Sequence, residues 1–138
     1  HFLRIIPNQI LNSVHMTTSP FPGFPTDLQA PFMALMATAN GTSKIKETVF
    51  ENRMHHVKEL NRMGAKITVR DNIAKVIGVK NLHGREVIGS DLRATAALAL
   101  AGLSANGKTI VKGLEHLERG YENFSEKFQA IGASILKK

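Results

Sequence analysis

Two segments of the chain carry apolar residues in patterns typical of helices. In residues 28–39 apolar side chains recur every three or four positions, which predicts a helix with one buried stripe. Residues 92–105 are apolar almost all round, and a helix of that composition is buried on most of its faces. Asn-Gly pairs follow both segments, at 40–41 and 106–107, and predict left-handed turns that end the helices.

A hydroxyl residue followed by an aspartate stands at the start of both helical segments. Thr26 precedes Asp27, and Gln29 lies three residues after Thr26, a spacing typical of a capping box. Ser90 precedes Asp91 in the same way. The pattern predicts Thr26 and Ser90 as N-caps. Each aspartate would then lie in a first helical turn, where the helix dipole favours its ionised form.

Shorter segments complete an α/β pattern. The predicted strands, from alternating or β-branched runs, are 42–49, 66–70, 74–79, 87–89, 108–111 and 134–136. The predicted amphipathic helices, each followed by a glycine, are 55–63 and 121–131. Because one of the two main helices is too apolar for a surface position, we expect buried helices and outer sheets.

The pattern of elements is repeated along the chain. Four short matches relate the two halves in the same order, roughly 65 residues apart. The matched segments are 26–30 with 90–94, 40–41 with 106–107, Arg53 with Arg119, and 63–65 with 131–133. They predict two copies of one unit, at about 26–79 and 87–138, within a single domain. Residues 1–25 would be the end of a preceding unit and a proline-rich lead-in.

The composition suits a folded domain with anionic partners. Hydrophobic residues make up 43% of the 138 residues, which argues against disorder. Eighteen Lys and Arg against 11 Asp and Glu give a formal net charge of +7, which favours anionic ligands. Nucleic-acid binders usually add aromatic residues or a continuous basic stripe, whereas this chain has no Trp, one Tyr and dispersed cations. Without Cys, disulfides and thiolate metal sites are excluded.

Membrane and metal-binding classes are not indicated. The longest apolar run, 94–103, is too short to span a bilayer, and no signal peptide is visible. His55, His56 and Glu59 have a spacing that metal ligands can adopt, but the pattern lacks further ligands, so an exposed helix face is the simpler interpretation. We expect no metal and no cofactor. The chain begins with His1 instead of Met, which suggests a piece of a longer polypeptide.

Four motifs together resemble one enzyme family. They are 19–29 (Ser-Pro-Phe-Pro-Gly-Phe-Pro-Thr-Asp-Leu-Gln), 47–53 (Glu-Thr-Val-Phe-Glu-Asn-Arg), 90–94 (Ser-Asp-Leu-Arg-Ala) and 118–122 (Glu-Arg-Gly-Tyr-Glu). In this order and spacing they closely resemble the UDP-N-acetylglucosamine 1-carboxyvinyltransferases, which are enolpyruvyl transferases. The resemblance covers the chain from Asn12 to its end and corresponds to the C-terminal third or so of such an enzyme.

The resemblance implies both a fold and a reaction. The fold is an inside-out, barrel-like α/β domain of three repeated units, of which this chain would hold two, facing a second domain across a cleft. The reaction moves the enolpyruvyl group of phosphoenolpyruvate to the 3-hydroxyl of UDP-N-acetylglucosamine and releases phosphate, in the first committed step of peptidoglycan synthesis, in the cytoplasm. The general acid and part of the phosphoenolpyruvate site belong to the absent domain, so we expect these 138 residues to be inactive alone.

The resemblance also assigns roles to individual residues. Asp27 matches the aspartate proposed as the base at the 3-hydroxyl, and Asp91 matches an aspartate of the active-site region, although a helix cap explains Asp91 equally well. An ionised Asp27 is a weak base, so deprotonation would accompany the attack of the hydroxyl. Val49 matches a position whose main chain holds the UDP-sugar.

Three arginines are the expected cations of the site. The planar guanidinium pairs with carboxylate or phosphate oxygens at two points, which suits a clamp on an anion. By resemblance Arg119 contacts phosphoenolpyruvate on its phosphate side, and Arg53 and Arg93 lie near its carboxylate. The expected substrate-binding residues are therefore Asp27, Val49, Arg53, Asp91, Arg93 and Arg119. The expected partners are the two substrates and the second domain, with neither nucleic acid nor membrane.

Two alternatives stay open. The related transferase that acts on shikimate 3-phosphate is built from the same repeat, although the motifs at 19–29 and 47–53 favour the UDP-sugar enzymes. The other alternative is a noncatalytic basic module that binds, for example, RNA. Its oligonucleotide binding would weaken steeply with salt and would not depend on Asp27.

Overall fold

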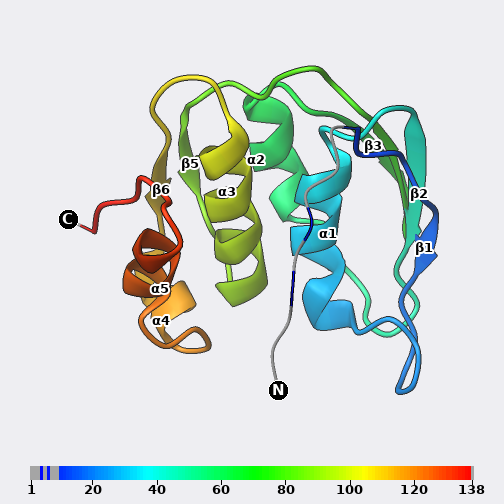
Figure 1. The fold of residues 1–138 in the computed structure, drawn as a ribbon. Coiled ribbons are helices and arrows are strands. Elements are labelled where there is room, and N and C mark those ends of the chain that lie inside the picture. Colours follow the sequence, from blue (N-terminus) through cyan, green and yellow to red (C-terminus); the bar gives the residue numbers. More distant parts are fainter. Residues whose placement is uncertain (1–3, 5, 7–9, 138) are drawn as a thin grey trace.

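Two helices lie side by side between two sheets (Figure 1). The computed structural model describes residues 4, 6 and 10–137, so parts of the predicted lead-in at 1–9 and residue 138 lie outside the described residues. The central helices are α1 (Gln29–Met36) and α3 (Leu92–Ser104), which share the most extensive contact of any two elements. The expected arrangement, with buried helices and outer sheets, is confirmed.

A four-stranded sheet flanks α1, and a two-stranded sheet flanks α3 (Figure 1). The larger sheet has the order β1-β2-β4-β3 and contains β1 (Met16–Thr17), β2 (Thr42–Lys46), β3 (Lys66–Arg70) and β4 (Ile73–Ile77). In it β1 is parallel to β2, and β4 is antiparallel to both of its neighbours. The smaller sheet pairs β5 (Glu86–Ile88) with β6 (Ile110–Lys112) in parallel.

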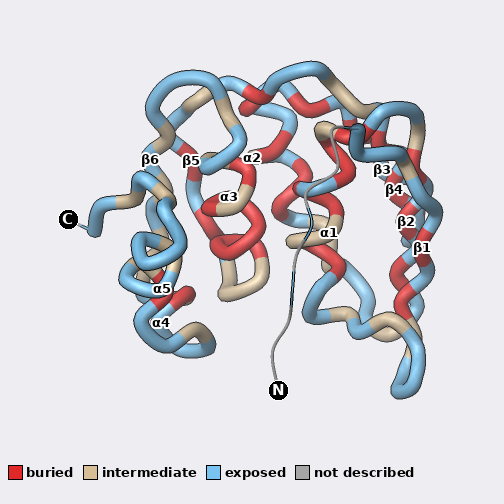
Figure 2. Tube along the Cα trace, viewed as in Figure 1, coloured by how far each residue is buried: buried red, intermediate tan, exposed pale blue. Residues whose placement is uncertain are grey.

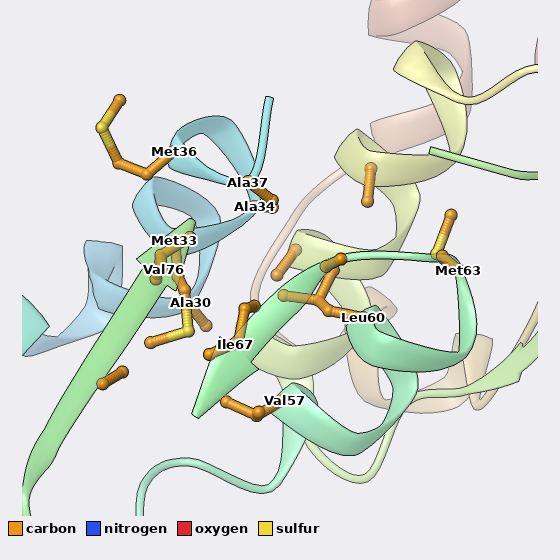
Figure 3. Close-up of a cluster of buried hydrophobic side chains, with 14 of the residues drawn as sticks. Ala30, Met33, Ala34, Met36, Ala37, Val57, Leu60, Met63, Ile67 and Val76 are labelled. Carbon is orange, nitrogen blue, oxygen red and sulfur yellow. The ribbon is translucent and has the colours of Figure 1, made fainter. Parts of the chain in front are cut away.

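The remaining helices are short. They are the 3-10 helix η1 (Thr26–Leu28), α2 (His56–Arg62), α4 (Leu114–Glu118) and α5 (Phe124–Ala130). Side chains of α1, α2, α3 and the inner face of the large sheet form one buried cluster (Figure 3). Figure 2 shows the buried residues along these elements. Ala30 and Ala34 of α1 and Ala97 and Ala101 of α3 are almost fully buried, and their small size allows the two helices to approach closely.

The predicted helix caps are wrong at both main helices. Thr26 does not cap α1, because its hydroxyl donates to the side chain of Glu47, and no side chain caps this helix. At α3 the cap is Asp91 and not Ser90, since Asp91 accepts the backbone N–H groups of the first turn. Asp91 is one residue closer to those N–H groups than Ser90, and with its extended backbone its carboxylate reaches them.

Other boundaries also differ from the sequence expectations. α1 ends at Met36 instead of residue 39, while Gly41 has the left-handed backbone (φ 108°) that turns the chain into β2. α4 was not predicted, because its five residues are too few for a periodic signal. The predicted strand at 134–136 is wrong, since no neighbouring strand pairs with it in the described part of the chain.

His56 is buried, contrary to the exposed helix face expected for it. His56 belongs to α2, which packs against α3. Only 3% of the residue is exposed, and its Nε2 has no hydrogen-bond partner among the described residues. Burial lowers its pKa to about 4, although the nearby Asp91 carboxylate opposes this shift. The neighbouring His55 is exposed. The folded protein therefore holds His56 as a neutral imidazole at neutral pH.

The burial of His56 predicts that the chain loses stability in mild acid. Between pH 7 and 5 the unfolded chain protonates this imidazole and the folded chain does not, so the free energy of unfolding should fall by about 2 kcal/mol. Urea denaturation at both pH values measures this change. In His56→Gln the fall should largely disappear, whereas His55→Gln should retain it. An equal fall in wild type and His56→Gln would contradict the assignment.

Candidate active site

Most of the predicted site residues lie at one end of the structure. η1 and the first turn of α3 lie at the lower edge of Figure 1, where the loop that follows β2 also arrives. This convergence follows from topology, since β1, β2 and β5 run toward that edge and the chain enters α1 and α3 from it. Residues far apart in the sequence can therefore form one site.

Asp27 lies between two arginines at this end. Its Oδ1 accepts hydrogen bonds from Nε of Arg93 at 2.5 Å and from Nη1 of Arg53 at 3.4 Å. The Asp27 side chain is 66% exposed, whereas those of Arg53 and Arg93 are 21% and 29% exposed. We name these three residues the Asp27 cluster. It has one negative and two positive charges, and its carboxylate faces solvent.

The arginines keep Asp27 ionised. The hydrogen bond from Arg93 is the main cause that lowers the pKa of Asp27, and it outweighs partial burial, which raises that pKa; the charge of Arg93 and the contact with Arg53 lower it further. The guanidinium of Arg53 is itself held in place, because its carbon lies 3.9 Å from the centre of the Phe50 ring. Each guanidinium has N–H groups beyond those that face Asp27, and these can bind an added anion.

Asp91 serves as the cap of α3. Its Oδ1 accepts the N–H groups of Arg93 at 2.9 Å and of Ala94 at 3.1 Å, and Ser90 donates to its Oδ2. Burial raises the pKa of Asp91, but these hydrogen bonds outweigh burial and lower it. Since the cap fixes the first turn of α3, Asp91 also sets the backbone that carries Arg93.

The other two predicted residues lie outside the Asp27 cluster. Val49 is in a bend after β2 and not in the predicted strand, and its N–H donates to Oε1 of Glu47 at 2.8 Å. Arg119 is exposed at the C-terminal end of α4. In the part of the chain that the structure describes, no hydrogen bond or ion pair joins Arg119 to the Asp27 cluster.

Glu47 is a residue of this region that the sequence analysis did not single out. It is 2% exposed, and its Oε1 accepts the Thr18 hydroxyl at 2.8 Å and the N–H groups of Val49 and Phe50 at 2.8 and 3.2 Å. Its Oε2 accepts the Thr26 hydroxyl at 2.8 Å. One buried carboxylate therefore holds the bend after β2 and the residue next to Asp27.

The alternation along β2 is the signal that could have found this glutamate. Ser43 and Ile45 are buried, and the same period of two places Glu47 on the inner side just after the strand ends. Burying a carboxylate costs free energy unless it is paired or hydrogen-bonded, so hydrogen-bond donors are expected around such a position.

A large apolar groove lies apart from the Asp27 cluster. It is lined mainly by α3, β6, α5 and the C-terminal residues 131–137, and a smaller pocket beside it includes Arg119. Within the described ranges, no group of three His, Cys, Asp or Glu residues could hold a metal ion. The helices described here are all too short or too polar to cross a membrane.

Comparisons with solved structures place the fold among the enolpyruvyl transferases. The structure of the enolpyruvyl transferase NikO from Streptomyces tendae matches with a TM-score of 0.83 and 33% sequence identity, over 93% of this chain and 30% of that one. An EPSP synthase from Acinetobacter baumannii matches with a TM-score of 0.68 and 18% identity, over 92% of this chain and 29% of that one, which supports the fold alone. The fold is therefore that of an enolpyruvyl transferase domain.

Sequence comparison defines the family more closely. The family described as EPSP synthase (3-phosphoshikimate 1-carboxyvinyltransferase) matches residues 3–128. The chain belongs to this family. It is 62% identical to UDP-N-acetylglucosamine 1-carboxyvinyltransferase 2 of Prochlorococcus marinus (strain SARG) over 96% of this chain and 31% of that relative. It is 57% identical to UDP-N-acetylglucosamine 1-carboxyvinyltransferase of Trichormus variabilis over 98% of this chain. The chain spans about 30% of the length of these relatives.

The Asp27 cluster predicts a measurable coupling between its members. Arg93→Gln should raise the pKa of Asp27 because it removes the shortest hydrogen bond to Oδ1. Arg53→Gln should raise that pKa less, because its contact is longer. A carbon-13 NMR titration of the Asp27 carboxyl measures both shifts. Arg119→Gln is the control and should leave the pKa unchanged; a shift as large as that of Arg93→Gln would contradict this geometry.

Proposed function

We propose that this chain supplies part of the active site of a UDP-N-acetylglucosamine 1-carboxyvinyltransferase. That enzyme transfers the enolpyruvyl group of phosphoenolpyruvate to the 3-hydroxyl of UDP-N-acetylglucosamine and releases phosphate. The observation that carries the proposal is the ionised Asp27 carboxylate held between Arg93 and Arg53. The identity of 55 to 62% to relatives with this name supports the same substrates.

Asp27 is the proposed base. Its exposed Oδ2 side can accept the proton of the sugar 3-hydroxyl while the hydroxyl oxygen forms a bond to the second carbon of phosphoenolpyruvate. Because its pKa is lowered, Asp27 is a weak base and takes the proton only as that bond forms. The proton added to the vinyl carbon comes from a general acid outside this chain. Phosphate then leaves the tetrahedral intermediate as the methyl carbon loses a proton to a base, which restores the double bond of the enolpyruvyl product.

The other site residues are proposed to bind the substrates. Arg53 and Arg93 would bind the carboxylate of phosphoenolpyruvate with the N–H groups that do not face Asp27. Arg119 would approach the phosphate side. Since the N–H of Val49 is bound to Glu47, a main-chain contact from Val49 to the UDP-sugar would use its carbonyl oxygen. Asp91 contributes by holding the turn that carries Arg93.

The proposed organisation places two repeated units in this chain and the other active-site groups in the rest of a longer enzyme. A helix, a strand and a further helix occur in this order in both halves, as α1, β2 and α2 and as α3, β6 and α5, with the short α4 inserted before α5. This order supports units at about 26–79 and 87–138. The full enzyme would act in the cytoplasm, and this chain alone would be inactive because the acid is elsewhere.

A transferase specific for shikimate 3-phosphate is a second candidate, because the family carries the name of that enzyme. Substrate competition distinguishes the two. A test protein is a chimera in which this chain replaces the matching 30% of the UDP-N-acetylglucosamine 1-carboxyvinyltransferase of Prochlorococcus marinus (strain NATL1A), which is 62% identical to it. Transfer of the enolpyruvyl group to shikimate 3-phosphate, with no transfer to the UDP-sugar when both are present, would favour the second candidate.

One surface favours the noncatalytic alternative. The outer face of the four-stranded sheet carries five cations and, among the described residues, no acid: Lys44, Lys46, Lys66, Arg70 and Lys75. Lys44 and Lys75 are direct cross-strand partners, an arrangement that destabilises a sheet unless an anion is near. Oligonucleotide binding that falls steeply with salt and is unchanged in Asp27→Asn would support this alternative.

The base assignment predicts the behaviour of Asp27→Asn in the chimera. The amide cannot accept the hydroxyl proton, so kcat should fall by about 10² to 10⁴, while the circular dichroism spectrum and the melting temperature stay unchanged. Glu86→Gln, which breaks an exposed ion pair with Lys112, is the control and should keep full activity. A wild-type rate in Asp27→Asn would exclude Asp27 as the base.

The proposed role of Arg119 predicts a selective loss. Arg119→Gln should raise the KM for phosphoenolpyruvate about tenfold or more, because an ionic hydrogen bond to its phosphate is lost, and should leave the KM for the UDP-sugar nearly unchanged. Steady-state kinetics of the chimera with each substrate varied measures both. Arg70→Gln, on the outer sheet face, serves as the control. An unchanged KM for phosphoenolpyruvate would count against this role.

A further inference from the structure

Glu47 is a buried carboxylate whose two oxygens both accept hydrogen bonds. Its Oε1 accepts three hydrogen bonds, and its Oε2 accepts the hydroxyl of Thr26 at 2.8 Å. Burial raises the pKa of Glu47, but the hydrogen bonds from Thr18, Val49, Thr26 and Phe50 outweigh burial and leave the pKa below its ordinary value. The side chain is therefore an ionised acceptor, and each neighbour must donate to it.

The backbone of Glu47 is fixed as firmly as its side chain. Its N–H donates to the carbonyl of Asn72 at 2.9 Å, and Nδ2 of Asn72 donates to the carbonyl of Glu47 at 2.8 Å. Asn72 belongs to the turn between β3 and β4, so Glu47 is anchored to the sheet and not only to the bend that follows it. The Glu47 carboxylate is thus held in a fixed position next to the Asp27 cluster.

The hydroxyl of Thr26 connects the Glu47 carboxylate to Arg53. Because the hydroxyl proton is donated to Glu47, the Thr26 oxygen is left as an acceptor, and Nη1 of Arg53 lies 3.4 Å from it. The same Nη1 lies 3.4 Å from Oδ1 of Asp27. The directions of donation therefore form one ordered chain, in which Arg53 donates to both Thr26 and Asp27, and Thr26 donates to Glu47.

We propose that Glu47 and Thr26 are positioning residues that hold the guanidinium of Arg53 beside Asp27. Neither needs to touch a substrate. Glu47 fixes the direction of the Thr26 hydroxyl, and the hydroxyl gives Arg53 a further contact besides those with Asp27 and the Phe50 ring. The remaining N–H groups of Arg53 then keep one orientation toward an incoming anion, which lowers the entropy cost of binding it. The effect on catalysis rests on the proposed function, whereas the positioning itself does not.

Thr26→Val and Thr26→Ser test this proposal as a pair. Valine has nearly the same shape but no hydroxyl, while serine keeps the hydroxyl. In Thr26→Val, Arg53 loses its contact with the Thr26 hydroxyl and spends less time beside Asp27, so the pKa of Asp27 should rise. In Thr26→Ser that pKa should stay near the wild-type value. Carbon-13 NMR titration of the Asp27 carboxyl in the 138-residue chain measures this. Thr38→Val is the matched control, because Thr38 is equally half-buried but its hydroxyl bonds a carbonyl of α1.

Glu47→Gln provides the second comparison. The amide group would donate to Thr26 and occupy the oxygen that accepts Arg53, so the pKa of Asp27 should rise as in Thr26→Val. If Glu47→Gln does not fold, the comparison of Thr26→Val with Thr26→Ser still tests the proposal. An Asp27 pKa in folded Thr26→Val equal to that in Thr38→Val would overturn the proposal.

The kinetic arm uses the chimera. Thr26→Val should raise the KM for phosphoenolpyruvate about tenfold, change kcat by less than about threefold, and recover in Thr26→Ser. A purely structural role would lower the melting temperature without this selective change in KM. If the wild-type chimera has no activity, the proposed function fails, and the NMR titration still decides whether Thr26 and Glu47 position Arg53.

Discussion

The packing of α1 against α3 is the constraint on which the rest of the structure depends. Both helices carry buried alanines, whose small size allows a close approach, and they share the most extensive contact of any two elements. Their first turns then lie at the same end of the structure, which brings Asp27 and Arg93, 66 positions apart in sequence, into hydrogen-bond contact. The sheets cover the outer sides of this pair and align the loops at the same end (Figure 1).

The main elements were predictable because apolar periodicity reports burial. Residues 92–105 were recognised as a buried helix, and the strand at 66–70 was predicted with the bounds that the structure shows. The failures have local causes. Thr26 has the sequence pattern of a cap, but a buried carboxylate competes for its hydroxyl. The segment at 134–136 has strand-forming residues, but no pairing strand lies beside it in the described chain.

The candidate site was predictable only in part. The motif resemblance predicts roles for Asp27, Arg53 and Arg93, and the structure brings these three side chains together. Sequence alone does not show that both arginines contact the same carboxylate oxygen. Glu47 lies inside the motif at 47–53, but the sequence does not distinguish it, because a single glutamate is usually exposed and its burial depends on tertiary contacts. The role of Arg119 stays a prediction, since it lies exposed and apart from the Asp27 cluster.

A crystal structure of the chimera with bound UDP-N-acetylglucosamine tests the central claim most directly. The account predicts that a carboxylate oxygen of Asp27 lies within hydrogen-bond distance of the sugar 3-hydroxyl, roughly 2.6 to 3.2 Å, with Arg93 still bound to Asp27. It also predicts that the carbonyl of Val49, and not its N–H, faces the ligand. A sugar bound elsewhere, with its 3-hydroxyl far from Asp27, would contradict the account.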